Sequence, residues 1–432
     1  MLCLTDVAEA YEDGKKLYHD ALNGKSDFDF TIKEIYGAET EVADACNCIA
    51  KGDNLRFMCH LITERQLSGR LQLIYTDPPF FSSGKYKASI RLESDVLGAS
   101  KLMKLEAYDD MWRCGMKEYL TMLTARLFAM RELLSDTGCM WMHLDWHSVY
   151  YVKVIMDQIF GESNFINEVI WTYKSGGSSK RSFSKKHDTL LVYGKGKNYK
   201  FRPLTEKSYN RGMKPYRFKG VEEFCDDKGW YTLVNMKDVW SIDMVGRTSA
   251  ERTGYATQKP EKLMERIIAS CTDEGDLCAD FFAGSGTLGA VCEKNGRRWL
   301  MCDEGGLAVA DQIQRLGSLG SSFYVVKDGA ADSETRLCYR AMGGLAELLS
   351  YDADMPEGLE TYEEEFNKYM SGDSLSMVKL WSIGREDDSG VFRANHLQAK
   401  TDGMFEFNEN DGNKTIRGYD VFGRSIRGIR EE

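Results

Sequence analysis

Four consecutive residues, Asp77-Pro78-Pro79-Phe80, combine groups that could do chemistry on an amino group. They follow an apolar run at 71–76 that reads as a short buried strand, which the two prolines must end. In an open α/β sheet, ligands bind at the carboxyl ends of the strands, where these residues would lie. Asp77 and the nearby backbone carbonyls only accept hydrogen bonds, which suits an exocyclic amino group, and Phe80 offers a flat face. For the tetrapeptide alone, a strand-ending turn without a catalytic role stays an alternative.

A second candidate site is the turn from Asp280 to Thr287, with the sequence DFFAGSGT. A strand predicted over 277–282 gives way here to a helix predicted over 287–294, and glycines let backbone N–H groups approach a ligand at a helix N-terminus. The next predicted strand, 299–302, is followed by two acidic residues that could accept hydrogen bonds from ribose hydroxyls. The candidate cofactor-binding residues of these segments are Asp280, Phe282, Ala283, Gly284, Ser285, Gly286, Thr287, Asp303 and Glu304.

The glycine turn differs from two common nucleotide sites. A phosphate-binding P-loop requires a lysine after its glycines, and none is present here. The spacing of the glycines also departs from G-x-G-x-x-G, which argues against NAD as the ligand. A tight strand-to-helix turn without a ligand is the alternative for this segment.

The net charge of −11 is distributed unevenly along the chain. Residues 174–219 contain fourteen basic and two acidic residues, which gives +12, so the other residues sum to −23. A basic surface with interleaved aromatic side chains suits the phosphates and bases of a nucleic acid. The segment therefore predicts a DNA-binding surface, with first candidates Lys174, Lys180, Arg181, Lys185 and Lys186. A solvated basic face without a partner is the competing interpretation.

The elements that must position these residues alternate between strands and helices. The predicted strands include 71–76, 139–144, 169–173 and 189–193, and the predicted helices include 116–134, 147–160 and 261–271, the last behind Pro260. This alternation predicts an α/β fold with a mainly parallel sheet. Residues 82–110 are polar and read as a long loop, and short strand-like pieces follow after about residue 340.

The cysteines and histidines give no sign of a metal site. The 12 cysteines are scattered, without a C-x-x-C pair, and the six histidines are dispersed. We therefore expect reduced cysteines that pack as small core residues, in a cytoplasmic protein without a structural metal. No apolar run is long enough to span a membrane, and the first residues lack the pattern of a signal peptide.

Taken together, the two motifs make the sequence similar to the β class of S-adenosylmethionine-dependent DNA amino-methyltransferases, over roughly residues 50–330. The Asp280–Thr287 turn matches the cofactor loop of that class, and Asp77–Phe80 matches its catalytic tetrapeptide. Thr257-Gln258-Lys259-Pro260 matches the element before the cofactor strand, and Gly52-Asp53-Asn54-Leu55 resembles a short motif upstream of the catalytic strand. The catalytic motif precedes the cofactor loop, which is the permuted order that defines the class.

Within this class the chain looks most like the modification subunits of type III restriction-modification systems and related solitary adenine methyltransferases. Residues 381–384 and 418–423 resemble the tails of those subunits. Two positions depart from the usual pattern. Phe281 replaces a proline in the cofactor loop, and Phe80 replaces the commoner tyrosine, which keeps the stacking face and removes a hydroxyl.

The resemblance implies a Rossmann-like methyltransferase fold in permuted order, with an inserted target-recognition region and a C-terminal accessory region. The corresponding segments are an N-terminal helical segment (1–50), a catalytic half (51–173), a target-recognition region (174–250), a cofactor half (251–335) and an acidic C-terminal accessory region (336–432). It also implies S-adenosylmethionine as cofactor, with Gln258 and Lys259 added to its binding residues. The implied partners are double-stranded DNA, a second copy of the chain and the helicase-nuclease subunit of a type III system.

The expected reaction is methyl transfer to the N6 amino group of adenine in duplex DNA, with Asp77, Pro78, Pro79 and Phe80 as catalytic residues. Aspartate rather than serine before the two prolines favours adenine over the N4 amino group of cytosine. The absence of cysteine from this loop disfavours a covalent route to cytosine C5. Three alternatives stay open: a cytosine-N4 methyltransferase, an amino-methyltransferase acting on RNA or protein, and an inactive DNA-binding subunit.

Overall fold

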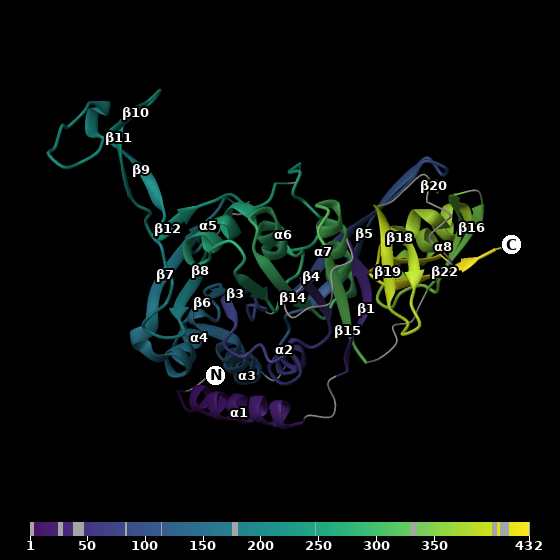
Figure 1. Ribbon diagram of the computed structural model, residues 1–432, viewed down its shortest axis with the longest axis horizontal. Coiled ribbons are helices and arrows are strands. Elements are labelled where there is room, and N and C mark those ends of the chain that lie inside the picture. The colour runs from purple at the N-terminus through teal and green to yellow at the C-terminus, as the bar shows by residue number, and fades with distance from the viewer. Residues whose placement is uncertain are drawn as a thin grey trace.

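The computed structural model describes residues 4–24, 29–37, 47–82, 84–113, 115–174, 180–246, 248–329, 335–342, 344–399, 404–406 and 414–431. Its centre is a mixed β-sheet with helices on both faces (Figure 1). This is the α/β architecture that the alternation of predicted strands and helices implies. Among these residues, no helix is both long enough and apolar enough to cross a membrane.

The central part of the sheet consists mostly of parallel strands. From one edge its order is β12 (Val239–Ser241), β7 (Phe165–Thr172), β8 (His187–Gly194), β6 (Leu134–Leu144), β3 (Leu71–Thr76), β13 (Leu277–Asp280), β14 (Arg298–Asp303), β2 (Cys48–Lys51), β15 (Phe323–Asp328) and β1 (Phe30–Tyr36). In this part, β8 and β1 run antiparallel to the strands just named beside them. Since β3, β6, β7, β13 and β14 share one direction, their carboxyl ends meet at one edge of the sheet, which we call the site edge.

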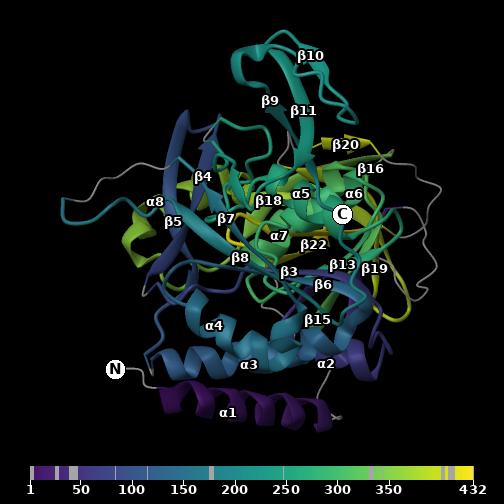
Figure 2. The ribbon, with the colours of Figure 1, turned by 90° about the vertical axis from the view of Figure 1, so that its left-hand side faces the viewer.

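Helices cover both faces of this sheet, as Figures 1 and 2 show. One face carries α2 (Asn54–Thr63), α3 (Met116–Leu133) and α4 (Val149–Met156), with α1 (Leu4–Asn23) packed outside them, and the other carries α5 (Glu261–Cys271), α6 (Thr287–Lys294) and α7 (Gly306–Ser318). The spacing of buried side chains explains this placement. On α5, for example, Leu263, Met264, Ile267 and Ile268 form one apolar stripe that faces the sheet. The helices predicted at 116–134, 261–271 and 287–294 are confirmed.

Between β8 and β12 the chain leaves the sheet and builds a projecting arm (Figures 1 and 2). The arm is a small antiparallel sheet of β9 (Thr205–Tyr209), β11 (Gly229–Asn235) and β10 (Phe224–Asp226). The residues predicted for target recognition, 174–250, are therefore not one structural unit, because β8 and β12 belong to the central sheet.

The C-terminal residues extend the sheet and have a hydrophobic core of their own. Their elements are β16 (Thr335–Met342), β17 (Leu345–Asp352), α8 (Glu363–Asp373), β18 (Val378–Glu386), β19 (Phe392–Ala399), β20 (Met404–Glu406), β21 (Thr415–Asp420) and β22 (Ser425–Arg430). These elements join the central sheet through a short stretch of pairing between β19 and β1, at Glu34–Phe392 and Ile35–Arg393.

Two predictions of local structure are wrong. Residues 82–110 are not a loop but contain a long hairpin, β4 (Lys85–Ser94) and β5 (Ala99–Asp109), which buries Ile90, Leu92 and Met103 in the C-terminal core. The N-terminal segment 1–50 is helical in α1, but it also supplies β1 and the central strand β2. In both cases long-range pairing, which local patterns do not reveal, decides the structure.

Candidate active site

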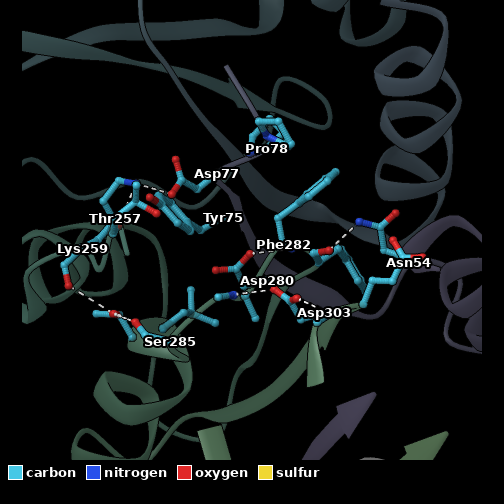
Figure 3. Close-up of a pocket in the computed structure, with 18 of the residues that line it drawn as sticks. Asn54, Tyr75, Asp77, Pro78, Thr257, Lys259, Asp280, Phe282, Ser285 and Asp303 are labelled. Atoms are coloured by element: carbon cyan, nitrogen blue, oxygen red, sulfur yellow. Dashed lines mark hydrogen bonds and ion pairs between the residues drawn. The ribbon is translucent and has the colours of Figure 1, made fainter. Parts of the chain in front are cut away.

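A pocket of about 530 Å³ opens at the site edge and contains both sequence motifs (Figure 3). The predicted residues that line it are Asp77, Pro78, Pro79, Phe80, Gln258, Lys259, Asp280, Phe282, Ala283, Gly284, Ser285, Thr287, Asp303 and Glu304. Gly286 is the exception among the predicted cofactor residues. It precedes α6 with φ of 71°, and a Cβ there would lie 2.9 Å from Gln312 Cγ, so tight packing explains this glycine.

Asp77 lies at the end of β3 and is 16% exposed. One of its carboxylate oxygens, Oδ2, accepts a hydrogen bond from Lys259 Nζ, which brings together residues 182 positions apart in the sequence. The other oxygen, Oδ1, is buried and accepts no hydrogen bond from the described residues. The site thus holds a carboxylate with hydrogen-bonding capacity that the surrounding protein does not use.

Behind Asp77 lies a buried polar chain that the sequence did not reveal. His143 Nδ1 is 3.7 Å from Asp77 Oδ1 and 2.7 Å from the Tyr75 hydroxyl, and its Nε2 is 3.2 Å from Asp188 Oδ2. The Tyr173 hydroxyl donates to the other oxygen of Asp188 at 2.9 Å. Burial opposes ionisation of Asp188, but the hydrogen bonds from His143 and Tyr173 and the nearby charge of Lys259 together lower the pKa of that carboxyl.

A buried aspartate fixes the loop that carries Asp77, which we call the Asp77 loop (residues 77–82). Asp110 is fully buried, and it accepts hydrogen bonds from the backbone N–H groups of Phe81 and Ser82 at 3.0 and 2.6 Å. The Ser82 hydroxyl and Trp112 Nε1 also donate to it, at 2.6 and 3.1 Å. Because Phe81 has φ of 65°, this support also holds an unfavourable backbone conformation.

The glycine turn forms the floor of the pocket between β13 and α6. Asp280 is buried at its start and accepts the Phe282 N–H at 3.0 Å, and burial raises the pKa of this carboxyl well above its usual value. Gly284 has φ of 47°, and a Cβ at this position would lie 3.2 Å from Cε1 of Tyr255. Backbone conformation therefore favours glycine here, and a Cβ would press against the Tyr255 ring.

Asp303 joins the glycine turn to the end of β14. Its carboxylate accepts the Gly284 N–H at 2.8 Å and the Gly305 N–H at 2.9 Å. Burial raises its pKa to about 6, although these two hydrogen bonds favour the ionised form. Glu304, next along the chain, is exposed at the pocket mouth.

The short motif after β2 lies on the opposite wall of the pocket and includes residues that the sequence had not assigned to the site. Asp53 caps α2 through the Arg56 N–H and forms an ion pair with Arg126 at 2.6 Å. The Asn54 side chain donates to the Phe281 carbonyl at 2.7 Å, which ties this wall to the glycine turn. Arg126 comes from the middle of α3, where no local pattern marks it.

The element before α5 closes the remaining side of the pocket. Gln258 accepts the Thr253 N–H through its side-chain oxygen at 2.9 Å, so its amide shapes the backbone turn. The Lys259 carbonyl accepts the Thr287 hydroxyl at 3.1 Å, which links this element to α6. Lys259 thereby touches both motifs, since its ammonium group binds Asp77.

The structure divides the basic residues of 174–219 into two groups. Lys200 and Arg202 are held by acidic residues of the protein, with Lys200 2.8 Å from Asp273 and 2.9 Å from Asp276. The predicted DNA contacts are Lys174, which is exposed although it lies 3.6 Å from Asp243, and the cations of residues 180–186, which we call the basic loop and which are exposed except for the half-buried Lys186. Part of the charge that the sequence suggested for DNA is therefore used within the protein.

The chain resembles known proteins along more than half of its length. Residues 71–311 match the N6/N4 methyltransferase family model, described as DNA methylase. The chain is 25% identical over 257 residues to the type II methyltransferase M2.DpnII of Streptococcus pneumoniae, spanning 59% of the chain and 84% of the relative. It is 26% identical over 329 residues to M.EcaI of Enterobacter cloacae, spanning 62% and 69%. The solved structure of the M1.HpyAVI-SAM complex aligns with 62% of this chain and 98% of its own, with a TM-score of 0.38 and 17% identity.

Proposed function

Because the chain belongs to the N6/N4 DNA methylase family, we propose that it transfers a methyl group from S-adenosylmethionine to the N6 amino group of adenine in duplex DNA. Methylation of DNA is the activity of the family, and the choice of adenine N6 over cytosine N4 is the finer part of the proposal. The observation that supports it is that the Asp77 loop, which offers acceptors, and the glycine turn line one pocket.

The pocket fits S-adenosylmethionine in charge and in shape. Its basic residues Arg126 and Lys259 are already paired with Asp53 and Asp77, while Asp303 and Glu304 add negative charge to its lining. Such a lining attracts a ligand that carries a sulfonium and an ammonium group. Gly284 and Tyr255 both line the pocket, and because Gly284 has no side chain a ligand can approach its backbone closely.

Individual residues match the parts of this ligand. Asp303 and Glu304 lie where an acidic residue accepts hydrogen bonds from ribose hydroxyls, and Phe282 lines the same pocket with a flat apolar face. When bound, S-adenosylmethionine supplies an electrophilic methyl group. The residues of this chain contribute the position and orientation of the amino group that attacks it.

Asp77 and the carbonyl of Pro78 accept hydrogen bonds from the target amino group, which directs its nitrogen toward the methyl group. Phe80 stacks against the base, while Lys259 and the chain behind His143 hold the Asp77 carboxylate in place. Since a base in a duplex is stacked, it must first be extruded into this pocket. Positioning of two bound reactants, without a covalent intermediate, accounts for the catalysis.

The decisive experiment measures which atom is methylated. The full chain is incubated with tritium-labelled S-adenosylmethionine and with DNA, RNA or protein, and the DNA is then hydrolysed to nucleosides and analysed by mass spectrometry. The proposal requires N6-methyladenine in DNA. N4-methylcytosine would replace adenine by cytosine as the target, label in RNA or protein alone would overturn the DNA substrate, and no label anywhere would indicate an inactive subunit. Long-read sequencing of DNA from cells that express the chain then gives the methylated motif.

A further inference from the structure

One exposed side chain of the basic loop has no role in the chemistry described above. Phe183 is 99% exposed, the highest value among the exposed large apolar side chains of the described residues. It is bracketed by Lys180, Arg181, Lys185 and Lys186, and since residues 180–186 contain no acid, the loop carries a charge of +4. Single exposed apolar residues are common on protein surfaces, so the position of this one decides its meaning.

The basic loop leaves the sheet at the site edge. It precedes β8 in the connection from β7, and β7 runs parallel to β6 and β3 because both β7 and β6 are antiparallel to β8. The Tyr173 N–H donates to the Lys186 carbonyl at 3.1 Å and so closes the base of the loop. Asp77, Trp146 and the basic loop thus all follow strands whose carboxyl ends lie at the same edge of the sheet, with β8 between β6 and β7.

A short series of contacts links the base of this loop to Asp77. The Tyr173 hydroxyl binds Asp188, Asp188 binds His143, and His143 lies 3.7 Å from Asp77 Oδ1. Asp188 follows the loop directly on β8, two residues after Lys186. The base of the loop that carries Phe183 is therefore linked to Asp77, the residue proposed to face the target base.

The side chains in and beside the loop are chemically complementary to a DNA duplex. Lys185 Nζ lies 3.3 Å from the centroid of the Trp146 ring, which is 41% exposed, so a cationic and an aromatic group lie together beside the loop. Cations suit the phosphates of both strands, and an exposed aromatic ring suits the space between base pairs.

We propose that Phe183 is a wedge that enters the DNA duplex where the target base leaves it. The proposal rests on the function proposed above, because only an extruded base leaves a gap in the stack. Phe183 fills that gap and stacks on the neighbouring bases, while the cations of the loop bind the flanking phosphates. The wedge lowers the cost of extrusion and so favours the complex in which the base lies beside Phe80.

The experiment compares Phe183→Ala and Phe183→Leu with the unchanged chain, on a duplex that carries its methylated motif. In one duplex the target is paired, and in a second it lies opposite a mismatched base, which makes extrusion easier. Phe183→Ala should lower kcat/KM by about 10- to 100-fold on the paired duplex, the range expected for loss of one stacking contact. The mismatched duplex should restore most of this loss, and Phe183→Leu should retain most of the activity because it keeps an apolar wedge.

Two measurements separate this role from others. The affinity for S-adenosylmethionine should be unchanged in Phe183→Ala, and Met342→Ala, which removes a side chain that is 72% exposed in the C-terminal region, should behave like the unchanged chain. Unchanged kcat/KM of Phe183→Ala on the paired duplex, or an equal loss on both duplexes, would overturn the wedge. If the unchanged chain methylates no DNA, the proposed function is wrong. If it methylates DNA but the Phe183 variants behave as just described, only the wedge is wrong, so the two failures are distinguishable.

Discussion

The Asp77 loop and the basic loop leave the same edge of the central sheet, after β3 and β7. The Asp77 loop is held from within, because the fully buried Asp110 accepts hydrogen bonds from the backbone of Phe81 and Ser82. In the basic loop, by contrast, Phe183 is 99% exposed, and Lys180, Arg181 and Lys185 are exposed as well. The first loop has its geometry built into the fold, whereas the second presents chemistry that suits an external partner.

This difference indicates that the Asp77 loop serves the chemical step, whereas the basic loop serves binding of the substrate. A residue that must orient one nitrogen atom needs a rigid frame, since an error of about 1 Å can cost about 100-fold in rate. A surface that binds phosphates must stay accessible and tolerates adjustment. Changes to the Asp77 loop should therefore affect turnover most, and changes to the basic loop should affect DNA affinity most.

The largest effect is expected for Asp77→Ala. It should reduce methyl transfer by more than about 100-fold, because the target amino group loses the carboxylate that orients it. Binding of S-adenosylmethionine, measured by calorimetry, should be preserved, since the carboxylates matched to its ribose come from β14. Turnover equal to that of the unchanged chain would show that Asp77 is not catalytic.

Gly284→Val should block cofactor binding while the chain stays folded. The branched side chain would enter the space beside Tyr255 and would strain a backbone with φ of 47°. Gly196→Val is the matched control, because a Cβ there meets no atom within 4 Å. Calorimetry should detect S-adenosylmethionine binding in the control and none in Gly284→Val, and equal affinities would contradict the assignment of the turn.

Asp110→Ala tests whether the frame behind the Asp77 loop matters. Removing this buried acceptor should lower the free energy of unfolding by about 2–4 kcal/mol, since each stranded donor costs about 1–3 kcal/mol. The turnover number should fall by about 10- to 100-fold because the loop shifts. Asp95→Ala, at the exposed turn of the β4–β5 hairpin, serves as control. Loss of stability with unchanged turnover would show that the frame does not position Asp77.

Replacing both Lys185 and Lys186 by glutamine should weaken DNA binding and make the DNA affinity less dependent on salt concentration. The slope of log affinity against log salt should decrease by roughly 1–2, because each phosphate contact contributes about 0.9. The same change at Lys200, which is bound to Asp273 and Asp276, should leave the slope unaltered. If the double variant keeps the original slope of log affinity against log salt, these lysines do not contact phosphates and the basic loop is a solvated surface.

The smallest effect concerns pH and Asp303. Burial raises the pKa of this carboxyl to about 6, so it becomes protonated as the pH falls below that value. Ribose hydroxyls donate better to the ionised form, so affinity for S-adenosylmethionine should fall as the pH drops through about 6, by at most about tenfold per pH unit. Asp303→Asn should bind more weakly and lose this pH dependence. Calorimetry between pH 5 and 8 checks both points.

The parts of the site that lie on contiguous segments could be predicted. Asp77–Phe80 and the Asp280–Thr287 turn each join a strand to the residues that follow it, so the apolar run and the turn chemistry are visible in one window. Arg126, His143 and Asp110 were missed because they come from other segments and act through single side chains. One signal was present for His143, since it is a polar residue near the end of an apolar strand and is followed by Asp145.

The sequence alone therefore determined the α/β class, the two motifs and the presence of a basic segment, because these depend on local periodicity and residue type. The tertiary structure decided how the basic residues are used, since Lys200 and Arg202 bind Asp273, which follows α5, while most of the basic loop is exposed. It also placed β2 in the middle of the sheet and joined the β4–β5 hairpin to the C-terminal core. Strand pairing and burial link residues far apart in the chain, and their energies depend on neighbours that no local window contains.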